Sequence, residues 1–266
     1  MKILTGPCVI ESRDNVMRIA EELQFLQDDK NIEFYFKASF DKANRTSLDS
    51  FRGPGLDEGL KILQEVKEQF GYKLVTDVHE TYQVAPTAEV TDIVQIPAFL
   101  CRQTDLLVAA GKSNAIVNIK KGQFLASESM KHPVAKVLKM RGCTEVNYKN
   151  SSSNNVWLCE RGNVFGYGSL IVDMKNLISM REFAPVIFDA THSAQVPSTG
   201  STTGGNSAIV PSLAKAAAAV GVDGFFFETH FDPSVALSDG PNMLTISELK
   251  KTIEDITLIQ KALGYK

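Results

Sequence analysis

Short apolar runs alternate with longer segments of helical period along the whole chain. The clearest helical segment is Leu56–Phe70, in which apolar residues recur every three or four positions with lysine and glutamate between them. The predicted strands are Lys2–Thr5, Glu33–Ser39, Lys73–Thr76, Ile93–Ile96, Ala115–Lys120, Val156–Cys159, Val186–Asp189 and Gly224–Phe227. The predicted helices are Asn15–Asp29, Leu56–Phe70, Tyr82–Val90, Asp105–Gly111, Lys131–Gly142, Asn176–Phe183, Ser207–Val220 and Ile246–Leu263.

Eight successive βα units with no linker between them predict a (β/α)8 TIM barrel, α/β in class, that forms a single domain over residues 1–266. An open, doubly wound parallel sheet is the alternative. Two polar runs of low complexity, Ser151–Asn155 and Ser198–Asn206, fall between predicted elements. We expect both of them to be loops.

The composition argues against several classes of protein. A net charge of −3 argues against nucleic-acid binding. No apolar run approaches the roughly 20 residues of a membrane span, and the N-terminal residues lack the core of a signal peptide, so we expect no membrane association. The four cysteines lack CxxC spacing, and we therefore expect reduced thiols and a cytoplasmic location.

Polar residues gather directly after the predicted strands. In a barrel of this type, the carboxyl ends of the strands form the rim that carries the active site. The residues at or just past the strand ends are Cys8, Lys37, Lys42, Arg45, Asp77, His79, Gln95, Arg102, Lys120, Lys121, Glu160, Arg161, Asp189, His192, Glu228 and His230. The loops of the opposite rim are short and carry little chemistry. This one-sided distribution predicts a functional site at the C-terminal rim.

The loop within Phe36–Gly55 is cationic, although the chain as a whole is negative. A solvated surface loop is the simple alternative to an anion site. The cations expected at the rim are Lys37, Lys42, Arg45, Arg102, Lys121 and Arg161. Cations that converge on one mouth repel one another unless an anion lies among them. The set therefore predicts a ligand with more than one phosphate or carboxylate.

A second set of rim residues has the donor atoms of a metal site. Its members are Cys8, His192, Glu228 and Asp239. One sulfur, one imidazole and two carboxylates suit Zn²⁺, Fe²⁺ or Mn²⁺. The spacing follows no short metal motif, and taken singly such residues are more often a buried cysteine or a hydrogen-bonded histidine. His79 and His230 are alternative ligands on the same grounds.

Six segments carry motifs of one enzyme family. They are Phe36–Ser47 (FKASFDKANRTS), Gln95–Asp105 (QIPAFLCRQTD), Asn118–Phe124 (NIKKGQF), Glu160–Tyr167, Asp189–Ser193 (DATHS) and Ala236–Asp239 (ALSD). Across nearly its whole length the chain resembles 3-deoxy-D-manno-octulosonate 8-phosphate (KDO8P) synthases. The resemblance implies a (β/α)8 barrel, usually a homotetramer. It also implies condensation of phosphoenolpyruvate with D-arabinose 5-phosphate, a step towards the KDO of lipopolysaccharide.

The resemblance assigns substrate sites position by position. The residues that match the phosphoenolpyruvate site are Lys37, Ser39, Lys42, Gln95, Lys121 and Arg161. Those that match the arabinose 5-phosphate site are Asn44, Arg45 and Thr46, the last of which is usually serine in the family. Arg102 matches an arginine that reaches the sugar site of a neighbouring subunit.

The resemblance also places the chain in one of two branches of the family. Cys8 stands where the metal-independent branch has asparagine, and Gly122 after Lys121 agrees with the metal-dependent branch. The implied ligands of one divalent metal ion, Zn, Fe(II) or Mn, are Cys8, His192, Glu228 and Asp239. The implied catalytic residues are Lys37, Lys42, His192 and Asp239.

Two stretches depart from the family pattern. Asn150–Asn155 looks like an insertion before the sixth strand, and Ser198–Asn206 differs from the usual loop after the seventh, a predicted lid. A related synthase that makes DAHP from erythrose 4-phosphate is one alternative, but its loop usually reads Lys-Pro-Arg-Thr where this chain has Lys42–Arg45 (KANR). A non-catalytic phosphosugar-binding barrel is the other alternative.

Overall fold

Eight parallel strands close into a barrel in the computed structural model, which describes residues 1–45, 47–164, 168–196 and 204–265. In order around the barrel they are β1 (Lys2–Gly6), β2 (Glu33–Lys37), β3 (Lys73–Asp77), β4 (Ile93–Ile96), β5 (Ile116–Lys120), β6 (Val156–Glu160), β9 (Val186–Asp189) and β12 (Gly224–His230). The first strand pairs with β2 on one side and with β12 on the other. This closure confirms the single-domain TIM barrel and excludes the open sheet.

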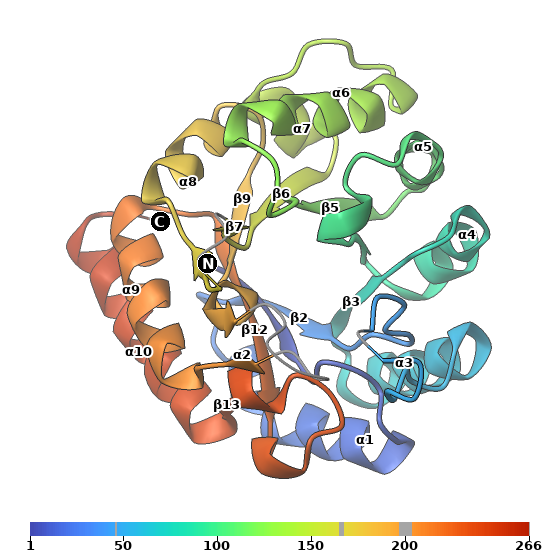
Figure 1. Ribbon diagram of the computed structural model, residues 1–266, viewed down its shortest axis with the longest axis vertical. Coiled ribbons are helices and arrows are strands. Elements are labelled where there is room, and N and C mark those ends of the chain that lie inside the picture. The colour runs from blue at the N-terminus through green and yellow to red at the C-terminus, as the bar shows by residue number, and fades with distance from the viewer. Residues whose placement is uncertain (46, 165–167, 197–203, 266) are drawn as a thin grey trace.

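The helices form a ring around the strands (Figure 1). They are α1 (Arg13–Glu22), α2 (Gln24–Asp28), α3 (Leu56–Phe70), α4 (Thr81–Val90), α5 (Thr104–Lys112), α6 (Lys131–Met140), α7 (Tyr148–Ser153), α8 (Met174–Arg181), α9 (Val210–Val220) and α10 (Ile246–Ala262). The main apolar core lies between strands and helices, because alternate strand residues face outward. Among the described residues, no helix combines the length and the apolar character that crossing a membrane requires.

A smaller apolar cluster fills the barrel interior. It contains Tyr35, Trp157, Phe226 and five smaller residues, and the ring of Tyr35 meets that of Trp157 edge to face at 5.8 Å. Lys2, the first residue of β1, lies over the Trp157 ring. Because these side chains close the N-terminal end of the barrel, the interior is accessible from the C-terminal end of the strands.

Several predicted boundaries were wrong in an informative way. The first predicted helix is two helices, α1 and α2, separated at Leu23. The predicted insertion loop Asn150–Asn155 is largely helical: α7 is capped by Asn147, whose side chain accepts a hydrogen bond from the backbone N–H of Asn150. Polar serines and asparagines favour a loop in isolation, but a satisfied N-cap allows a short helix.

Short strand pairs at the rim were also missed. The pairs are β7 (Asn163–Val164) with β8 (Leu170–Ile171), and β10 (Gln195–Val196) with β11 (Gly204–Gly205). A further strand, β13 (Leu244–Thr245), pairs with the end of β12. The predicted lid, Ser198–Asn206, lies mostly outside the described residues, and only its last part belongs to β11. Two-residue strands have too little sequence pattern to be recognised.

The cationic loop that follows β2 is held against α3 at one close contact. Gly59 of α3 lies so near to Phe40 that a β-carbon at this glycine would meet the Phe40 β-carbon at 2.3 Å. Phe40 also accepts a backbone hydrogen bond from Gly55 at 3.0 Å. The guanidinium of Arg52 pairs with Asp41 on the exposed side of the loop, away from the barrel mouth. These contacts leave Lys42 and Arg45 as the cations that the loop offers to the rim.

Candidate active site

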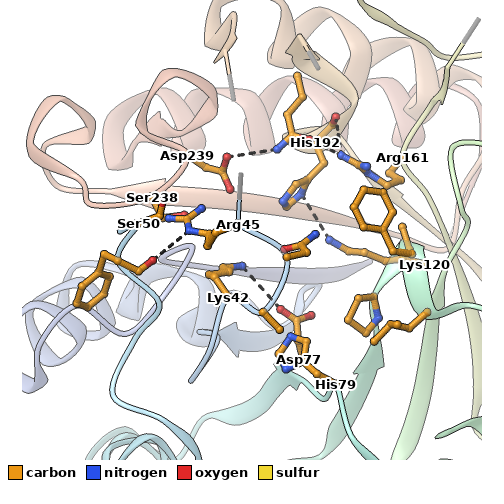
Figure 2. Close-up of a pocket in the computed structure, with 18 of the residues that line it drawn as sticks. Lys42, Arg45, Ser50, Asp77, His79, Lys120, Arg161, His192, Ser238 and Asp239 are labelled. Carbon is orange, nitrogen blue, oxygen red and sulfur yellow. Dashed lines mark hydrogen bonds and ion pairs between the residues drawn. The ribbon is translucent and has the colours of Figure 1, made fainter. Parts of the chain in front are cut away.

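The carboxyl ends of the strands surround a cavity of about 750 Å³. Its lining includes Lys42 and Arg45 after β2, Asp77 at the end of β3, and His192 after β9. Figure 2 shows these side chains around one opening, together with Lys120, Arg161 and Asp239. A cavity of this size accommodates small phosphorylated molecules. The rim therefore has the hollow, charged site that the sequence predicts.

The predicted cations take different positions around this cavity. Lys42, Arg45 and Arg161 line it directly. Lys37 lies beneath it, fully buried, and its ammonium donates to Glu228 Oε1 at 2.5 Å and to the carbonyl of Cys8 at 2.7 Å. The buried ammonium of Lys37 thus neutralises Glu228 and supports the backbone after β1. The exposed Arg102 does not line the cavity of its own chain.

The lysine of β5 that faces the cavity is Lys120, not the predicted Lys121. The Lys120 ammonium lies 2.7 Å from Asp189 Oδ2 and 4.0 Å from the centre of the Phe226 ring, inside the barrel. Lys121 is completely buried on the other side and donates to Asn163 Oδ1 at 2.7 Å. Successive residues of a strand point to opposite faces, so only one of two adjacent lysines can face the interior. The structure therefore places Lys120 at the cavity, whereas Lys121, the residue predicted to bind a ligand, does not line it.

Asp77 is the centre of a buried hydrogen-bond network under the cavity. Its carboxylate accepts from Ser39 Oγ at 2.6 Å and from Gln95 Nε2 at 2.5 Å, and Gln95 in turn accepts from Asn118 Nδ2 at 2.9 Å. The Lys42 ammonium lies 3.8 Å from Asp77 Oδ2. Burial opposes ionisation of Asp77, but Lys42 and neighbouring lysines hold the pKa of this carboxyl well below its usual range. The network fixes the orientations of Ser39 and Gln95.

Replacing Asp77 with asparagine is expected to destabilise the fold in a pH-dependent way. At neutral pH we expect a loss of about 3 kcal/mol, because the variant removes one of the buried carboxylates that offset the charges of the buried lysines, the one 3.8 Å from Lys42. The lowered pKa of Asp77 means that its contribution is complete above the unfolded value of about 4 and declines as the pH falls below it. Urea unfolding of both proteins between pH 3.5 and 7.5 measures the difference. A difference that grows towards acid pH would contradict the ionised, cation-paired state.

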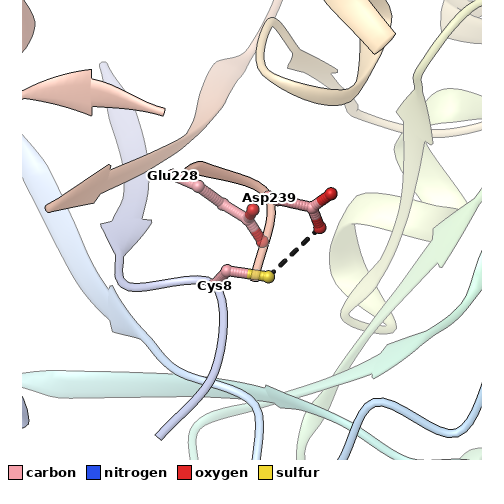
Figure 3. Close-up of side chains that lie close together, drawn as sticks. All are labelled: Cys8, Glu228 and Asp239. Atoms are coloured by element: carbon pink, nitrogen blue, oxygen red, sulfur yellow. Dashed lines mark hydrogen bonds between the residues drawn. The ribbon is translucent and has the colours of Figure 1, made fainter. Parts of the chain in front are cut away.

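Three of the four predicted metal ligands lie together (Figure 3), and one of them, Asp239, lines the cavity. One donor atom from each of Cys8, Glu228 and Asp239 lies within 4.8 Å of the other two. The Cys8 thiol is 3.2 Å from Asp239 Oδ2. Glu228 Oε2 is buried and has no hydrogen-bond partner among the described residues, as expected of an atom whose partner is a cation. Thiolate and carboxylate donors in this arrangement fit a divalent transition metal.

The electrostatics of this cluster also call for a cation. Burial and the adjacent Glu228 carboxylate raise the pKa of the Cys8 thiol well above its ordinary value. The thiolate form, which is the metal ligand, is therefore unstable at neutral pH without an added positive charge. Burial also opposes ionisation of Glu228, yet Lys37, His192 and Lys42 keep its pKa low, so this carboxylate is ready to bind.

His192 borders the cluster without joining it. Its Nδ1 is 2.8 Å from Asp189 Oδ2, and its Nε2 is 3.7 Å from Glu228 Oε1. A carboxylate at Nδ1 leaves Nε2 directed to a ligand, which is the usual support for a metal-binding histidine. The alternative ligands have other partners: His79 lines the cavity but packs edge to face on Phe40, and His230 contacts the backbone of Asp232. Among the described residues neither belongs to the metal cluster.

Comparison with known proteins identifies the family to which this chain belongs. A profile of the DAHP synthetase I family matches residues 1–262. The chain belongs to the DAHP synthetase I family. A relative from Campylobacter jejuni (strain 81-176), named 2-dehydro-3-deoxyphosphooctonate aldolase, is 59% identical over 261 residues, which cover 98% of this chain and 96% of the relative. Proteins of the same name from Wolinella succinogenes and Helicobacter hepaticus are 58% identical over 262 residues and 56% identical over 267. These alignments cover 98% and 100% of this chain, and 100% and 99% of the respective relatives.

In this member of the DAHP synthetase I family, the structure also adds site residues that sequence reasoning missed. Ser238 Oγ lies 3.0 Å from Cys8 Sγ. Gln195 accepts a hydrogen bond from Arg161 and donates one to Asp239 Oδ1 at 3.3 Å, so it connects Arg161 to the cluster of Cys8, Glu228 and Asp239. The sequence signal for Gln195 is its closeness to a predicted ligand, whereas Ser238 belongs to the ALSD motif.

The structure describes two of the three neighbouring residues, 44–46, that were predicted to bind the sugar phosphate. Asn44 and Arg45 line the cavity, and Arg45 donates to the carbonyl of Phe51 at 3.0 Å, which fixes its guanidinium across the loop. Thr46 lies outside the described residues. Of the three residues Asn44, Arg45 and Thr46 predicted to bind the sugar, the structure thus places the first two at the cavity.

Proposed function

We propose that this chain is a KDO8P synthase, also called 2-dehydro-3-deoxyphosphooctonate aldolase. It condenses phosphoenolpyruvate with D-arabinose 5-phosphate and water to give 3-deoxy-D-manno-octulosonate 8-phosphate and phosphate. The observation that carries the proposal is one cavity in which cations face a thiol–carboxylate cluster, in a chain 59% identical to a relative of that name. The cavity offers charge for two anionic substrates and donors for one cation.

The cationic wall is the proposed phosphoenolpyruvate site. Lys42, Lys120 and Arg161 reach the cavity from the carboxyl ends of three different strands, and two or three charged contacts of this kind suit a phosphate with an adjacent carboxylate. Buried beneath them are Lys37, Ser39 and Gln95, which complete this site by orienting the groups above. Asn44 and Arg45 are the proposed contacts of the sugar phosphate, with the hydroxyl of Thr46.

The reaction forms one carbon–carbon bond and one carbon–oxygen bond, and it breaks a different carbon–oxygen bond. Carbon 3 of phosphoenolpyruvate attacks the aldehyde carbon of the sugar, and the oxygen of water adds at carbon 2. The hemiketal phosphate then loses phosphate by cleavage of the bond between carbon 2 and the phosphate oxygen. One proton of the water balances the proton gained by the aldehyde oxygen, and the other leaves the hemiketal hydroxyl as the ketone forms and is taken up by the departing phosphate.

The side chains around the cavity can neutralise these charges and can donate and accept these protons. The Lys42 ammonium lies 3.8 Å from Asp77 and 3.9 Å from Glu228, and it can donate to the aldehyde oxygen as this becomes a hydroxyl. His192 and Asp239 border the opposite wall, where they can orient water and accept its proton. A cation held by Cys8, His192, Glu228 and Asp239 would supply Lewis-acid polarisation there. Holding two anions side by side is the main contribution of the lysines and arginines.

Assembly and location form part of the same proposal. Arg102 is exposed and lies outside the cavity of its own chain, which agrees with a role at the sugar site of a neighbour in a homotetramer. The described residues hold four free cysteines, and a thiol that binds a metal has to remain reduced. We therefore place the enzyme in the cytoplasm.

Phosphate release with two aldose phosphates tests the function. With phosphoenolpyruvate present, we expect turnover with arabinose 5-phosphate to exceed that with erythrose 4-phosphate by at least about tenfold, because polar groups built for the longer sugar remain unpaired with the shorter one. A preference for erythrose 4-phosphate would identify a DAHP synthase. Absence of phosphate release with both sugars, in protein loaded with Mn²⁺ or Zn²⁺, would favour a binding protein.

A further inference from the structure

The carboxylate of Glu11 joins two loops that are far apart in the sequence. Its side chain is only 6% exposed. Oε1 accepts a hydrogen bond from the backbone N–H of Leu237 at 2.7 Å, and Oε2 accepts one from Asn15 Nδ2 at 3.1 Å. His230 Nε2 lies 3.8 Å from Oε2. The carboxylate therefore ties the loop after β1 to the segment Ala236–Asp239, which we call the strap.

The strap carries contacts to both halves of the cavity. The carbonyl of Leu237 accepts a hydrogen bond from Arg45 Nη2 at 3.4 Å. The next two residues, Ser238 and Asp239, both contact the Cys8 thiol. Leu237 thus has its N–H bound to Glu11 and its C=O bound to Arg45, immediately before the cluster.

The backbone conformation of the strap at Asp239 requires contacts with other parts of the chain. Asp239 adopts a left-handed backbone conformation, with φ of 52°, which is uncommon for any residue other than glycine. Such a conformation persists where surrounding contacts enforce it. The hydrogen bond from the N–H of Leu237 to Glu11, two residues before Asp239, is one such contact, beside that of Ser238 with the Cys8 thiol.

We propose that Glu11 is a positioning residue that holds Asp239 at Cys8 and, through the carbonyl of Leu237, orients Arg45. The part of this inference that concerns Arg45 rests on the proposed function, whereas the part that concerns Asp239 rests on the cluster geometry alone. The essential property of Glu11 is then its reach to the N–H of Leu237, more than its charge. An amide of the same length keeps that acceptor, and a carboxylate shorter by one methylene loses it.

Binding of Co²⁺, followed by the absorption of the cobalt–thiolate bond, tests the first part without any assay of turnover. We expect Glu11→Ala and Glu11→Asp to weaken Co²⁺ binding about tenfold or more, as for other residues that orient metal ligands, and Glu11→Gln to stay within about threefold of the unmodified protein. Glu33→Ala is the matched control, because Glu33 is a glutamate paired with Lys73 and Tyr35 at the other end of the barrel. Equal affinities for all variants, or a loss in Glu11→Gln as large as in Glu11→Asp, would overturn the proposal.

Two further readouts separate positioning from general stability. In the metal-free protein, amide hydrogen exchange of the strap is expected to accelerate in Glu11→Asp and not in Glu11→Gln. In turnover, Glu11→Asp is expected to raise KM for arabinose 5-phosphate about tenfold while KM for phosphoenolpyruvate changes less than about twofold, since Arg45 and not Arg161 contacts the strap. Equal rises in both KM values would refute the link to Arg45. If the unmodified protein does not turn over, the proposed function fails, and the Co²⁺ and exchange measurements still decide the role of Glu11.

Discussion

Replacing Cys8 with alanine is expected to reduce turnover about a thousandfold and to make the remainder insensitive to added divalent metal. The thiol is the only sulfur donor in the cluster with Glu228 and Asp239, and its loss leaves two carboxylates beside a buried lysine. A Lewis acid contributes several kcal/mol of transition-state stabilisation, and about 4 kcal/mol corresponds to a thousandfold. The measurement is phosphate release from chelator-treated protein, before and after addition of Mn²⁺ or Zn²⁺.

Cys143→Ala is the matched control for this experiment. Cys143 is partly exposed after α6, and its thiol contacts the carbonyl of Glu145. It does not line the cavity. We expect this variant to lose activity on chelation and to regain it with metal, like the unmodified protein. Full turnover in metal-stripped Cys8→Ala would show that the cluster does not hold a catalytic cation.

Replacing Lys120 with methionine is expected to raise KM for phosphoenolpyruvate about 100-fold. Its ammonium faces the cavity from inside the barrel, between Asp189 and the mouth. Removing one charged partner of a desolvated anion typically costs about 2–5 kcal/mol. Initial rates at varied phosphoenolpyruvate and saturating arabinose 5-phosphate measure the effect. The adjacent lysine supplies the control, because it has the same chemistry on the opposite face.

Lys121→Met is expected to act on stability in place of binding. The Lys121 ammonium is 3.6 Å from Glu160 Oε2, and both side chains are fully buried. Without the lysine, the buried Glu160 carboxylate loses its cation, and we expect a loss of about 3 kcal/mol in the free energy of unfolding. Burial already raises the pKa of Glu160, so this carboxyl can protonate and limit the loss. A larger rise in KM for Lys121→Met than for Lys120→Met would restore the original assignment of Lys121.

Local pattern was enough to predict the barrel. The helical period of Leu56–Phe70 is strong, and α3 begins and ends at the predicted residues. Four of the eight strands were longer at their ends than predicted, most clearly β12, which continues to His230. Glu228 lies within the strand because it pairs with Gly6 of β1, and His230 does so because it pairs with β13, which is too short to recognise in sequence.

The set of residues at the C-terminal rim could be predicted in part from the order of the strands. Parallel strands bring their carboxyl ends to one face, so polar residues that follow the strands are certain to share a rim once the barrel is recognised. Cys8, Glu228 and Asp239 were expected together and lie together. The pattern could not determine which rim residues touch, because contacts depend on loop paths and rotamers that sequence spacing does not encode.

By itself, therefore, the sequence determined the (β/α)8 architecture and the end of the barrel at which the charged residues gather, because both follow from periodicity along the chain. Only the tertiary structure decided that Lys120 faces the cavity while Lys121 pairs with Glu160. It also decided that Glu11 contacts a residue 226 positions away. The physical reason is the same in each case. The direction of a side chain and its long-range contacts are fixed when separate strands and loops pack together, and the local sequence pattern does not specify that packing.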